Sequence, residues 1–117
     1  MRQLTPEEVT FTLEVEPEWE IAIIGNCSAI SKEIDRETAE WIGEQIEAGN
    51  EWAWCYVIVR AQWEGFEGMD SLGGCSYMSE EEFTAPGGYY EDMKQQALDD
   101  LNRIIAETSS RLEILAA

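Results

Sequence analysis

Histidine is absent from this 117-residue chain, and lysine and arginine together number only seven. Without histidine the commonest general base is missing, and neither Ser-His nor Cys-His nucleophile pairs can form. Carboxylate pairs are plentiful, but among 25 acidic residues any single pair is expected by chance. We therefore expect a protein that is not an enzyme, and we keep a small enzyme with a carboxylate dyad as the third alternative.

Metal and nucleotide motifs are missing as well. Three widely spaced cysteines (Cys27, Cys55 and Cys75) without histidine do not match the usual zinc spacings. The glycines do not form a phosphate-binding loop, and the ligand spacing of an EF-hand is lacking. We expect neither a metal nor a cofactor.

Long apolar runs are also lacking. No run approaches the roughly 20 residues that span a bilayer, and the first residues contain no apolar core of a signal peptide. An odd number of cysteines argues against a secreted disulfide framework. The prediction is a cytoplasmic protein.

What the chain has in excess is negative charge, with a formal net charge of −18. Solubility in a small domain is usually served by a net charge of magnitude about 2–8. The excess destabilises the fold through self-repulsion, so it calls for an explanation. The basic residues are scattered singly and form no basic patch, so we expect no direct binding of nucleic acid or of an anionic membrane.

Enough apolar residues remain for one core, since 44% of the chain is hydrophobic. We therefore expect a single domain over 1–117. Alternation, helical spacing and turn residues predict the elements. In chain order they are a capped turn at 5–8, a strand over 9–15 that ends by Pro17, a helix over 35–48 with Asp35 as N-cap, a strand over 51–63, a turn at Glu64-Gly65, a strand over 66–77, a short capped turn after Ser79, and a helix over 90–115.

This β-α-β-β-α order predicts an α+β fold, a small and mostly antiparallel sheet covered by two helices. In the strand 51–63 one face should be buried, and the first half should be buried on both faces, as in a central strand. Those buried-face residues are Ala53, Cys55, Val57, Val59 and Ala61. The inward face of the last helix is predicted to consist of Met93, Ala97, Leu101, Ile104, Ile105, Thr108, Leu112 and Leu115.

The carboxylates recur at regular spacing in two rows. In the first helix steps of four and three residues place the acids on one helical face. Before it, steps of two place acids on one strand face if the strand continues past Pro17. The candidate partner-binding residues are Glu33, Glu37, Glu40, Glu44 and Glu47 in the first row, and Glu14, Glu16, Glu18 and Glu20 in the second.

Such rows could stand in for the phosphates of a nucleic acid. The helical row places one carboxylate about every 5 Å, whereas duplex DNA offers one charge about every 1.7 Å. Mimicry therefore requires several rows to converge on one face. The partner would be a basic, nucleic-acid-binding protein, and the simpler alternative is that the acids are only a solvated surface, as in salt-adapted proteins.

The five tryptophans allow two interpretations. Trp41, Trp52 and Trp54 are predicted to pack in the core, whereas Trp19 and Trp63 lie beside glutamates and could anchor a protein interface. A homodimer is a further alternative, if the aromatic face of the strand 51–63 is not fully covered.

The segments WAWCYVIVRAQWEGFEGMDSLGGCSY, SEEEF, APGGYYEDM and ALDDLN resemble a family of small acidic proteins encoded in phages and prophages. The resemblance covers roughly residues 8–105 and is most specific over 52–103. It carries no functional residues with it. It implies a viral setting, in which small acidic proteins without catalytic motifs are often inhibitors of host defence, including anti-CRISPR and antirestriction proteins.

Together these features give one leading hypothesis and one alternative. The leading hypothesis is a phage-encoded, DNA-mimicking inhibitor of a host defence complex, with an anti-CRISPR role as its sharpest form. The alternative is a non-catalytic interaction or structural module of phage biology that uses an apolar surface, with its charge serving only solubility.

Overall fold

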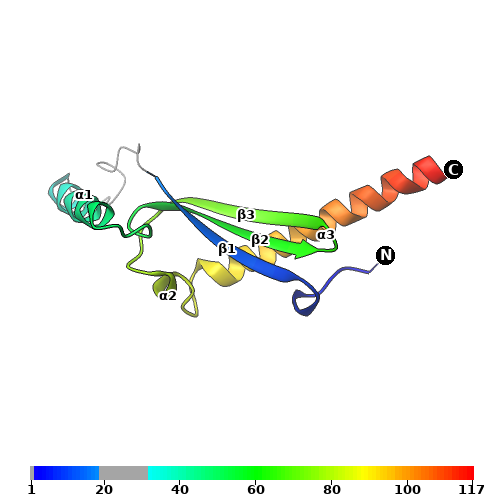
Figure 1. The fold of residues 1–117 in the computed structure, drawn as a ribbon, viewed down its shortest axis with the longest axis horizontal. Coiled ribbons are helices and arrows are strands. Elements are labelled where there is room, and N and C mark those ends of the chain that lie inside the picture. The colour runs from blue at the N-terminus through cyan, green and yellow to red at the C-terminus, as the bar shows by residue number, and fades with distance from the viewer. Residues whose placement is uncertain (1, 19–31) are drawn as a thin grey trace. The chain divides into compact units, whose positions relative to one another are not determined.

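The computed structural model describes residues 2–18 and 32–117, and the side chains of these residues except 32–35. It confirms the α+β class: three antiparallel strands in the order β1-β2-β3, with helices (Figure 1). The elements are η1 (Pro6–Glu8), β1 (Thr10–Pro17), α1 (Lys32–Glu47), β2 (Cys55–Trp63), β3 (Phe66–Cys75), α2 (Glu80–Phe83) and α3 (Tyr89–Ala116).

The chain forms two compact units, and each of the three strands contributes one part to each unit. Unit 1 comprises residues 1–14, 58–71 and 86–117, and it contains η1, the β2–β3 hairpin end and α3. Unit 2 comprises residues 15–57 and 72–85, and it contains α1 and α2.

Strand β2 is the central strand, and its alternation sets the core. Every odd-numbered residue from Cys55 to Ala61 is fully buried, as the sequence predicts. The opposite face is mixed, because Ile58 is buried whereas Tyr56 is exposed. The expected burial of both faces in the first half of the strand is therefore only partly met.

The central strand begins at Cys55, later than the predicted start at residue 51. Asn50 is the reason. Its side-chain oxygen accepts a hydrogen bond from Trp52 N–H at 3.1 Å, and its carbonyl accepts one from Ala53 N–H at 3.2 Å. These bonds fold residues 51–54 into a turn, since an asparagine side chain can replace a backbone partner.

A two-residue turn joins β2 to β3. Both Glu64 (φ 46°) and Gly65 (φ 83°) have positive φ, which is the geometry of a type I′ hairpin turn. Gly65 adopts this region without strain, but a glutamate does so at a cost. β3 then ends at Cys75, two residues before the predicted end.

In unit 1, α3 packs on the hairpin through Met93, Ala97, Leu98 and Leu101, all of which are buried. Gly68 of β3 makes this packing close: a Cβ atom there would collide with the backbone of α3 at Ala97 and Leu101. The helix therefore lies directly against the strand, which only glycine permits.

Two polar side chains of α3 fix neighbouring backbone. The Asn102 side chain accepts from Leu4 N–H at 2.8 Å and donates to Leu4 C=O at 3.2 Å, so it holds the N-terminal segment as a neighbouring strand would. Asp100 accepts from Met69 N–H at 2.9 Å on the edge strand β3. Burial of α3 stops after this region: Ile104 and Ile105 are half-buried, and residues 111–117 are all exposed. The predicted inward positions Leu112 and Leu115 therefore do not face the core.

In unit 2, α1 packs through Ile42 and Ile46 against Ala53 and Trp54. The helix begins at Lys32, so Asp35 lies inside it and is not its N-cap. The added residues Lys32, Glu33 and Ile34 have good to moderate helix propensity, which accounts for the earlier start.

The short helix α2 closes unit 2 at an aromatic cluster. Ser79 Oγ accepts from Glu82 N–H at 3.3 Å and caps the helix, as predicted. Phe83 is buried against Trp52 and Tyr77, with ring centroids 5.3 Å and 5.0 Å away. The core prediction thus holds for Trp54, which is buried, whereas Trp52 is half-buried beside Phe83.

Candidate functional site

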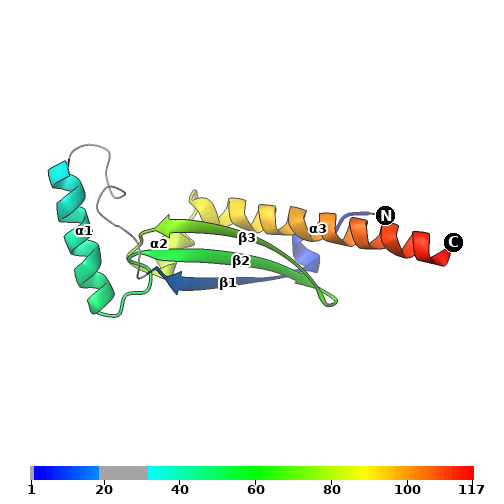
Figure 2. The same ribbon diagram turned by 90° about the horizontal axis from the view of Figure 1, so that it is seen from above.

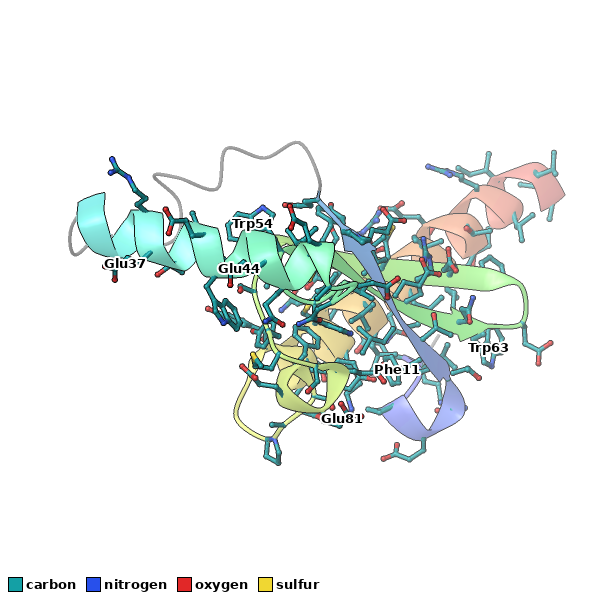
Figure 3. The ribbon with its side chains drawn as sticks, turned by 60° about the vertical axis from the view of Figure 1, so that its left-hand side comes forward. Phe11, Glu37, Glu44, Trp54, Trp63 and Glu81 are labelled. Atoms are coloured by element: carbon teal, nitrogen blue, oxygen red, sulfur yellow. The ribbon has the colours of Figure 1, made fainter. Side chains whose placement is uncertain are left out.

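The acidic row of α1 occupies one exposed helical face. Glu37, Glu40, Glu44 and Glu47 are all exposed, and their spacing of three, four and three residues keeps them on one side of the helix. Figure 3 shows Glu37 and Glu44 along the same edge of α1. Glu33 lies within the helix, but its side chain is outside the described residues.

The rotation of α1 is set by its apolar stripe, not by the acids. Ala39 and Ile42 are buried and Ile46 is partly buried, on the side opposite the row. Because Ile42 and Ile46 pack on Ala53 and Trp54, just before the central strand, the acids are directed away from the core of unit 2. The sequence periodicity alone predicts this arrangement.

Trp41 borders the row. The prediction that Trp41 packs in the core is wrong. Its side chain is 39% exposed. On the helix it lies between the positions of Glu37 and Glu44, three and four residues away on either side. Tryptophan is enriched at the hot spots of protein interfaces. Trp41 therefore places a large aromatic ring beside the charged row.

The second predicted row is largely engaged within the chain. Glu14 Oε1 lies 2.6 Å from Arg60 Nη1. Glu18 is half-buried, and its carboxylate accepts from Gly74 N–H at 3.4 Å. Glu16 is exposed, and Glu20 lies outside the described residues. Two of the three described members therefore hold strands together.

The ion pairs of the described residues all lie in unit 1. Arg60 also contacts Glu67 at 3.5 Å, and Arg103 lies between acids one turn to either side. The paired residues are Arg2 with Glu8, Arg60 with Glu14 and Glu67, Lys94 with Glu91, and Arg103 with Asp100 and Glu107. In unit 1, then, much of the acidity is compensated locally.

Unit 2 is the more acidic of the two: it has thirteen acidic residues and two basic ones, against twelve and five in unit 1. The acids are Glu16, Glu18, Glu20, Glu33, Asp35, Glu37, Glu40, Glu44, Glu47, Glu51, Glu80, Glu81 and Glu82, and the bases are Lys32 and Arg36. Three consecutive exposed acids fill the first turn of α2, where Figure 3 labels Glu81. The candidate site consists of the exposed acids of unit 2 among the described side chains, and we call it the acidic surface of unit 2. Its members are Glu16, Glu37, Glu40, Glu44, Glu47, Glu51, Glu80, Glu81 and Glu82.

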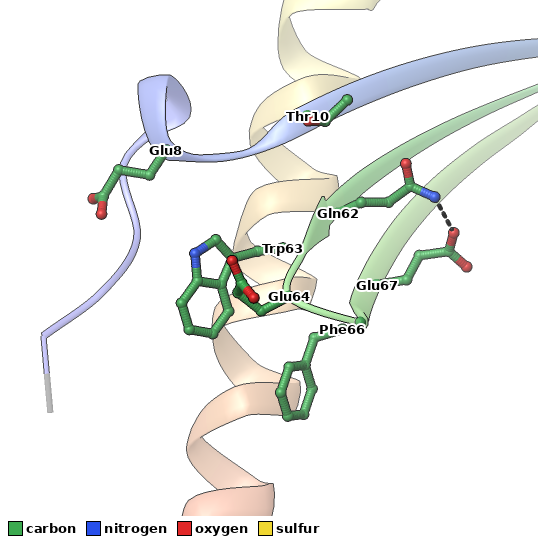
Figure 4. A pocket seen from close by; sticks show the side chains of 8 residues that line it. Glu8, Thr10, Gln62, Trp63, Glu64, Phe66 and Glu67 are labelled. Atoms are coloured by element: carbon green, nitrogen blue, oxygen red, sulfur yellow. Dashed lines mark hydrogen bonds between the residues drawn. The ribbon is translucent and has the colours of Figure 1, made fainter.

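A cavity of about 590 Å³ lies at the hairpin end of unit 1 (Figure 4). It is lined by Glu8, Thr10, Gln62, Trp63, Glu64, Gly65, Phe66 and Glu67. The rings of Trp63 and Phe66 stack with centroids 6.3 Å apart.

Three of the residues that line this cavity are glutamates. Glu8, Glu64 and Glu67 are exposed, and Glu67 accepts from Gln62 at 3.0 Å. Hydrogen bonds from Arg2 lower the pKa of Glu8 to about 2, with further help from Thr5. Glu8 is therefore ionised at neutral pH.

The two described cysteines face the interior of unit 2. Burial first, and then the nearby Cys75 and Glu18, raise the pKa of Cys55 to about 12. Burial, followed by Glu18, raises the pKa of Cys75 to about 11. Both thiols therefore stay protonated at neutral pH and behave as small apolar residues, not as nucleophiles.

Among the described side chains no group of three or more Cys, Asp and Glu is placed to hold a metal ion. None of the helices in the described part of the chain is long and apolar enough to cross a membrane. Comparison of the chain with protein-family models, curated proteins and solved structures finds no match to any of them.

Proposed function

We propose that this protein is a non-catalytic inhibitor that uses the acidic surface of unit 2 to occupy a nucleic-acid-binding site on a basic protein. The observation that carries the proposal is the uneven compensation of charge. The ion pairs of the described residues lie in unit 1, whereas unit 2 has thirteen acids, two bases and an exposed row of glutamates. Unit 2 thus has a formal charge of −11 against −7 for unit 1, and its described helices carry exposed acids in close succession.

The α1 row supplies the repeated charge that such a partner recognises. Its carboxylates follow one another about every 5 Å along the helix axis, and the exposed acids of α2 add to the same unit. Lysines and arginines that normally hold phosphates would bind these carboxylates through charge-assisted hydrogen bonds. The attraction also speeds the encounter of the two proteins, and salt weakens it.

Trp41 supplies the apolar part of the contact. Acids alone give affinity that any polyanion could displace, whereas a partly exposed indole beside them can bury its ring against one particular partner. The row thus provides attraction and Trp41 provides selectivity.

The class of partner follows from the resemblance to phage-encoded acidic proteins. In that setting the basic protein is a nucleic-acid-binding component of a host defence system. An anti-CRISPR inhibitor that blocks a guide- or target-binding surface is the sharpest form of the proposal.

Affinity capture from a lysate of the natural host tests the proposal, with charge reversal on the α1 row as the perturbation. The triple variant Glu37→Lys, Glu40→Lys, Glu44→Lys should lose the partner, because about 3 kcal/mol of binding free energy, roughly a hundredfold in Kd, is removed. The captured protein should bind nucleic acid, and duplex or guide RNA should compete with this chain for it.

The matched control reverses three exposed acids of unit 1 that make no ion pair among the described residues: Glu7→Lys, Asp92→Lys, Asp99→Lys. Both variants change the net charge equally, so only position differs. Retention of the partner by the control and its loss by the α1 variant support the proposal. Equal effects, or a partner without a nucleic-acid site, contradict it.

The alternative, an interaction module that binds through an apolar surface, is favoured by one observation. The end of α3 exposes Leu112, Ile114 and Leu115. In that case partner affinity would be nearly independent of salt, and the α1 reversals would leave it unchanged.

A further inference from the structure

The last turns of α3 leave the rest of unit 1. Figures 1 and 2 both show the helix continuing past the Glu64–Gly65 turn of the hairpin. All described residues from 111 to 117 are exposed, and the Thr108 hydroxyl bonds only back to Ile104 C=O of the same helix, at 2.7 Å. This end therefore gains little from packing within unit 1.

An apolar stripe nevertheless continues along this end. Leu101, Ile105, Thr108, Leu112 and Leu115 follow one another at steps of four, three, four and three residues. This is the spacing of the a and d positions of a coiled coil. Leu101 is buried under the hairpin, but Leu112 is 58% exposed and Leu115 is 81% exposed, so one continuous seam passes from protein into solvent.

The seam starts beside a cavity of about 330 Å³ in the same unit. The apolar side of this cavity consists of Leu4, Trp63, Ile105 and Ala106, and its polar side of Arg2, Gln3 and Asn102. We call the exposed seam and the apolar side of the cavity the apolar tract.

Charge indicates what covers the tract. Residues 103–117 contain two cations, Arg103 and Arg111, and two anions, Glu107 and Glu113, so the segment is neutral in a chain with net charge −18. A basic partner would be matched by an acidic surface, which this is not. A neutral apolar seam is complementary to another of the same kind, and a second copy of the chain supplies one by two-fold symmetry.

We propose that the exposed end of α3 pairs with the same segment of a second copy, with Leu112 and Leu115 packed into the facing helix. The contact is short, below the roughly 1,200 Å² typical of a stable interface, so the dimer dissociates readily. This surface is distinct from the aromatic face of the predicted strand 51–63, where Trp54 and Ile58 are buried and Tyr56 is exposed.

Salt separates this contact from the acidic surface. Two chains of charge −18 repel each other, and salt screens the repulsion without weakening an apolar seam. Dimerisation therefore strengthens as salt increases, whereas binding of a basic partner weakens. Failure of either proposal leaves the other intact.

Sedimentation equilibrium of the full chain at micromolar to millimolar concentration tests the proposal. The mass should rise from 13.3 kDa toward twice that value, and it should do so at lower protein concentration in high salt. Leu112→Glu should raise the dissociation constant about tenfold or more, because a charge would enter the seam.

Ile114→Glu is the matched control. Ile114 is 77% exposed on the opposite side of the helix, and the substitution adds the same charge without touching the seam. It should dimerise as the unaltered chain does. A mass of 13.3 kDa under all conditions, or equal effects of the two substitutions, overturns the proposal. Circular dichroism of both variants checks that α3 remains folded.

Discussion

Neutralising part of the α1 row should stabilise the protein while weakening its binding to a partner. Glu40→Gln with Glu44→Gln removes three like-charge contacts at helical spacing, those of 37 with 40, 40 with 44, and 44 with 47. At about 0.2–0.5 kcal/mol each, these contacts sum to roughly 1 kcal/mol. The last turn of α1 contains no basic residue, so neutralising an acid near that end adds a few tenths of a kcal/mol.

Urea and thermal unfolding measure the effect. The double variant should raise the free energy of unfolding by about 1–2 kcal/mol at low salt, and the midpoint temperature by about 4–8 °C. In about 1 M salt most of the gain should disappear, because the screening length falls to roughly 3 Å. Glutamine and glutamate have similar helix propensity, so the change isolates charge.

The same chemical change in unit 1 provides the control. Glu107 Oε1 lies 3.0 Å from Arg103 Nη1, so Glu107→Gln removes an attraction and should lower stability slightly at low salt. Two results would contradict this prediction: a shift of stability in the same direction for both variants, or a gain from the α1 variant that persists undiminished in high salt. Either result would mean that repulsion within the row is not what is being relieved.

Three further predictions concern the fold. Gly68→Ala should lower the free energy of unfolding by about 3 kcal/mol, because the added methyl group meets the backbone of α3. Gly43→Ala in α1 has open space around it and should raise the free energy of unfolding by about 0.5–1 kcal/mol. Urea unfolding distinguishes these opposite signs. Glu64→Gly should raise the free energy of unfolding by about 1 kcal/mol, because it relieves the strain of a non-glycine residue at φ 46°. Thermal unfolding measures this, and an unchanged melting temperature would contradict the turn geometry. The Glu8 carboxyl should titrate near pH 2 by NMR, so the stability that it contributes above its ordinary pKa of 4.5 is lost as the pH falls toward 2; Arg2→Ala should return the pKa toward 4.5.

Much of the fold could be predicted because local patterns and tertiary packing agree. The odd-numbered residues from Cys55 to Ala61 alternate strictly and are buried, and the Glu64-Gly65 turn lies between the paired strands as expected. The acidic face of α1 also followed from periodicity alone, since its apolar stripe fixes its rotation.

The predictions of the fold are wrong where a single side chain or the end of a neighbouring element determines the local structure. Asn50 bonds to the backbone of the next residues and delays the central strand, which no alternation could show. Trp41 lies at the margin of the buried stripe, so its aromatic character wrongly indicated the core. Leu112 and Leu115 continue the inward stripe of α3 beyond the point at which the hairpin ends. The periodicity of a helix does not show where the strands that it packs on end.

The sequence did not show which acids of the two predicted rows are engaged within the chain. Glu14 and Glu18 share the spacing of free acids, yet Arg60 and the backbone of Gly74 engage them. Both partners come from distant parts of the sequence, so spacing alone could not separate acids that bind within the chain from acids that face solvent. The local compensation of unit 1 was invisible for the same reason.

The salt dependence of partner affinity is the most direct test of binding through the acidic surface of unit 2. Titration calorimetry of the captured partner with the unaltered chain, at salt concentrations from about 50 mM to about 500 mM, should show Kd rising about tenfold or more, because screening removes the attraction of the acidic surface of unit 2. A Kd that stays the same across this range would contradict the account.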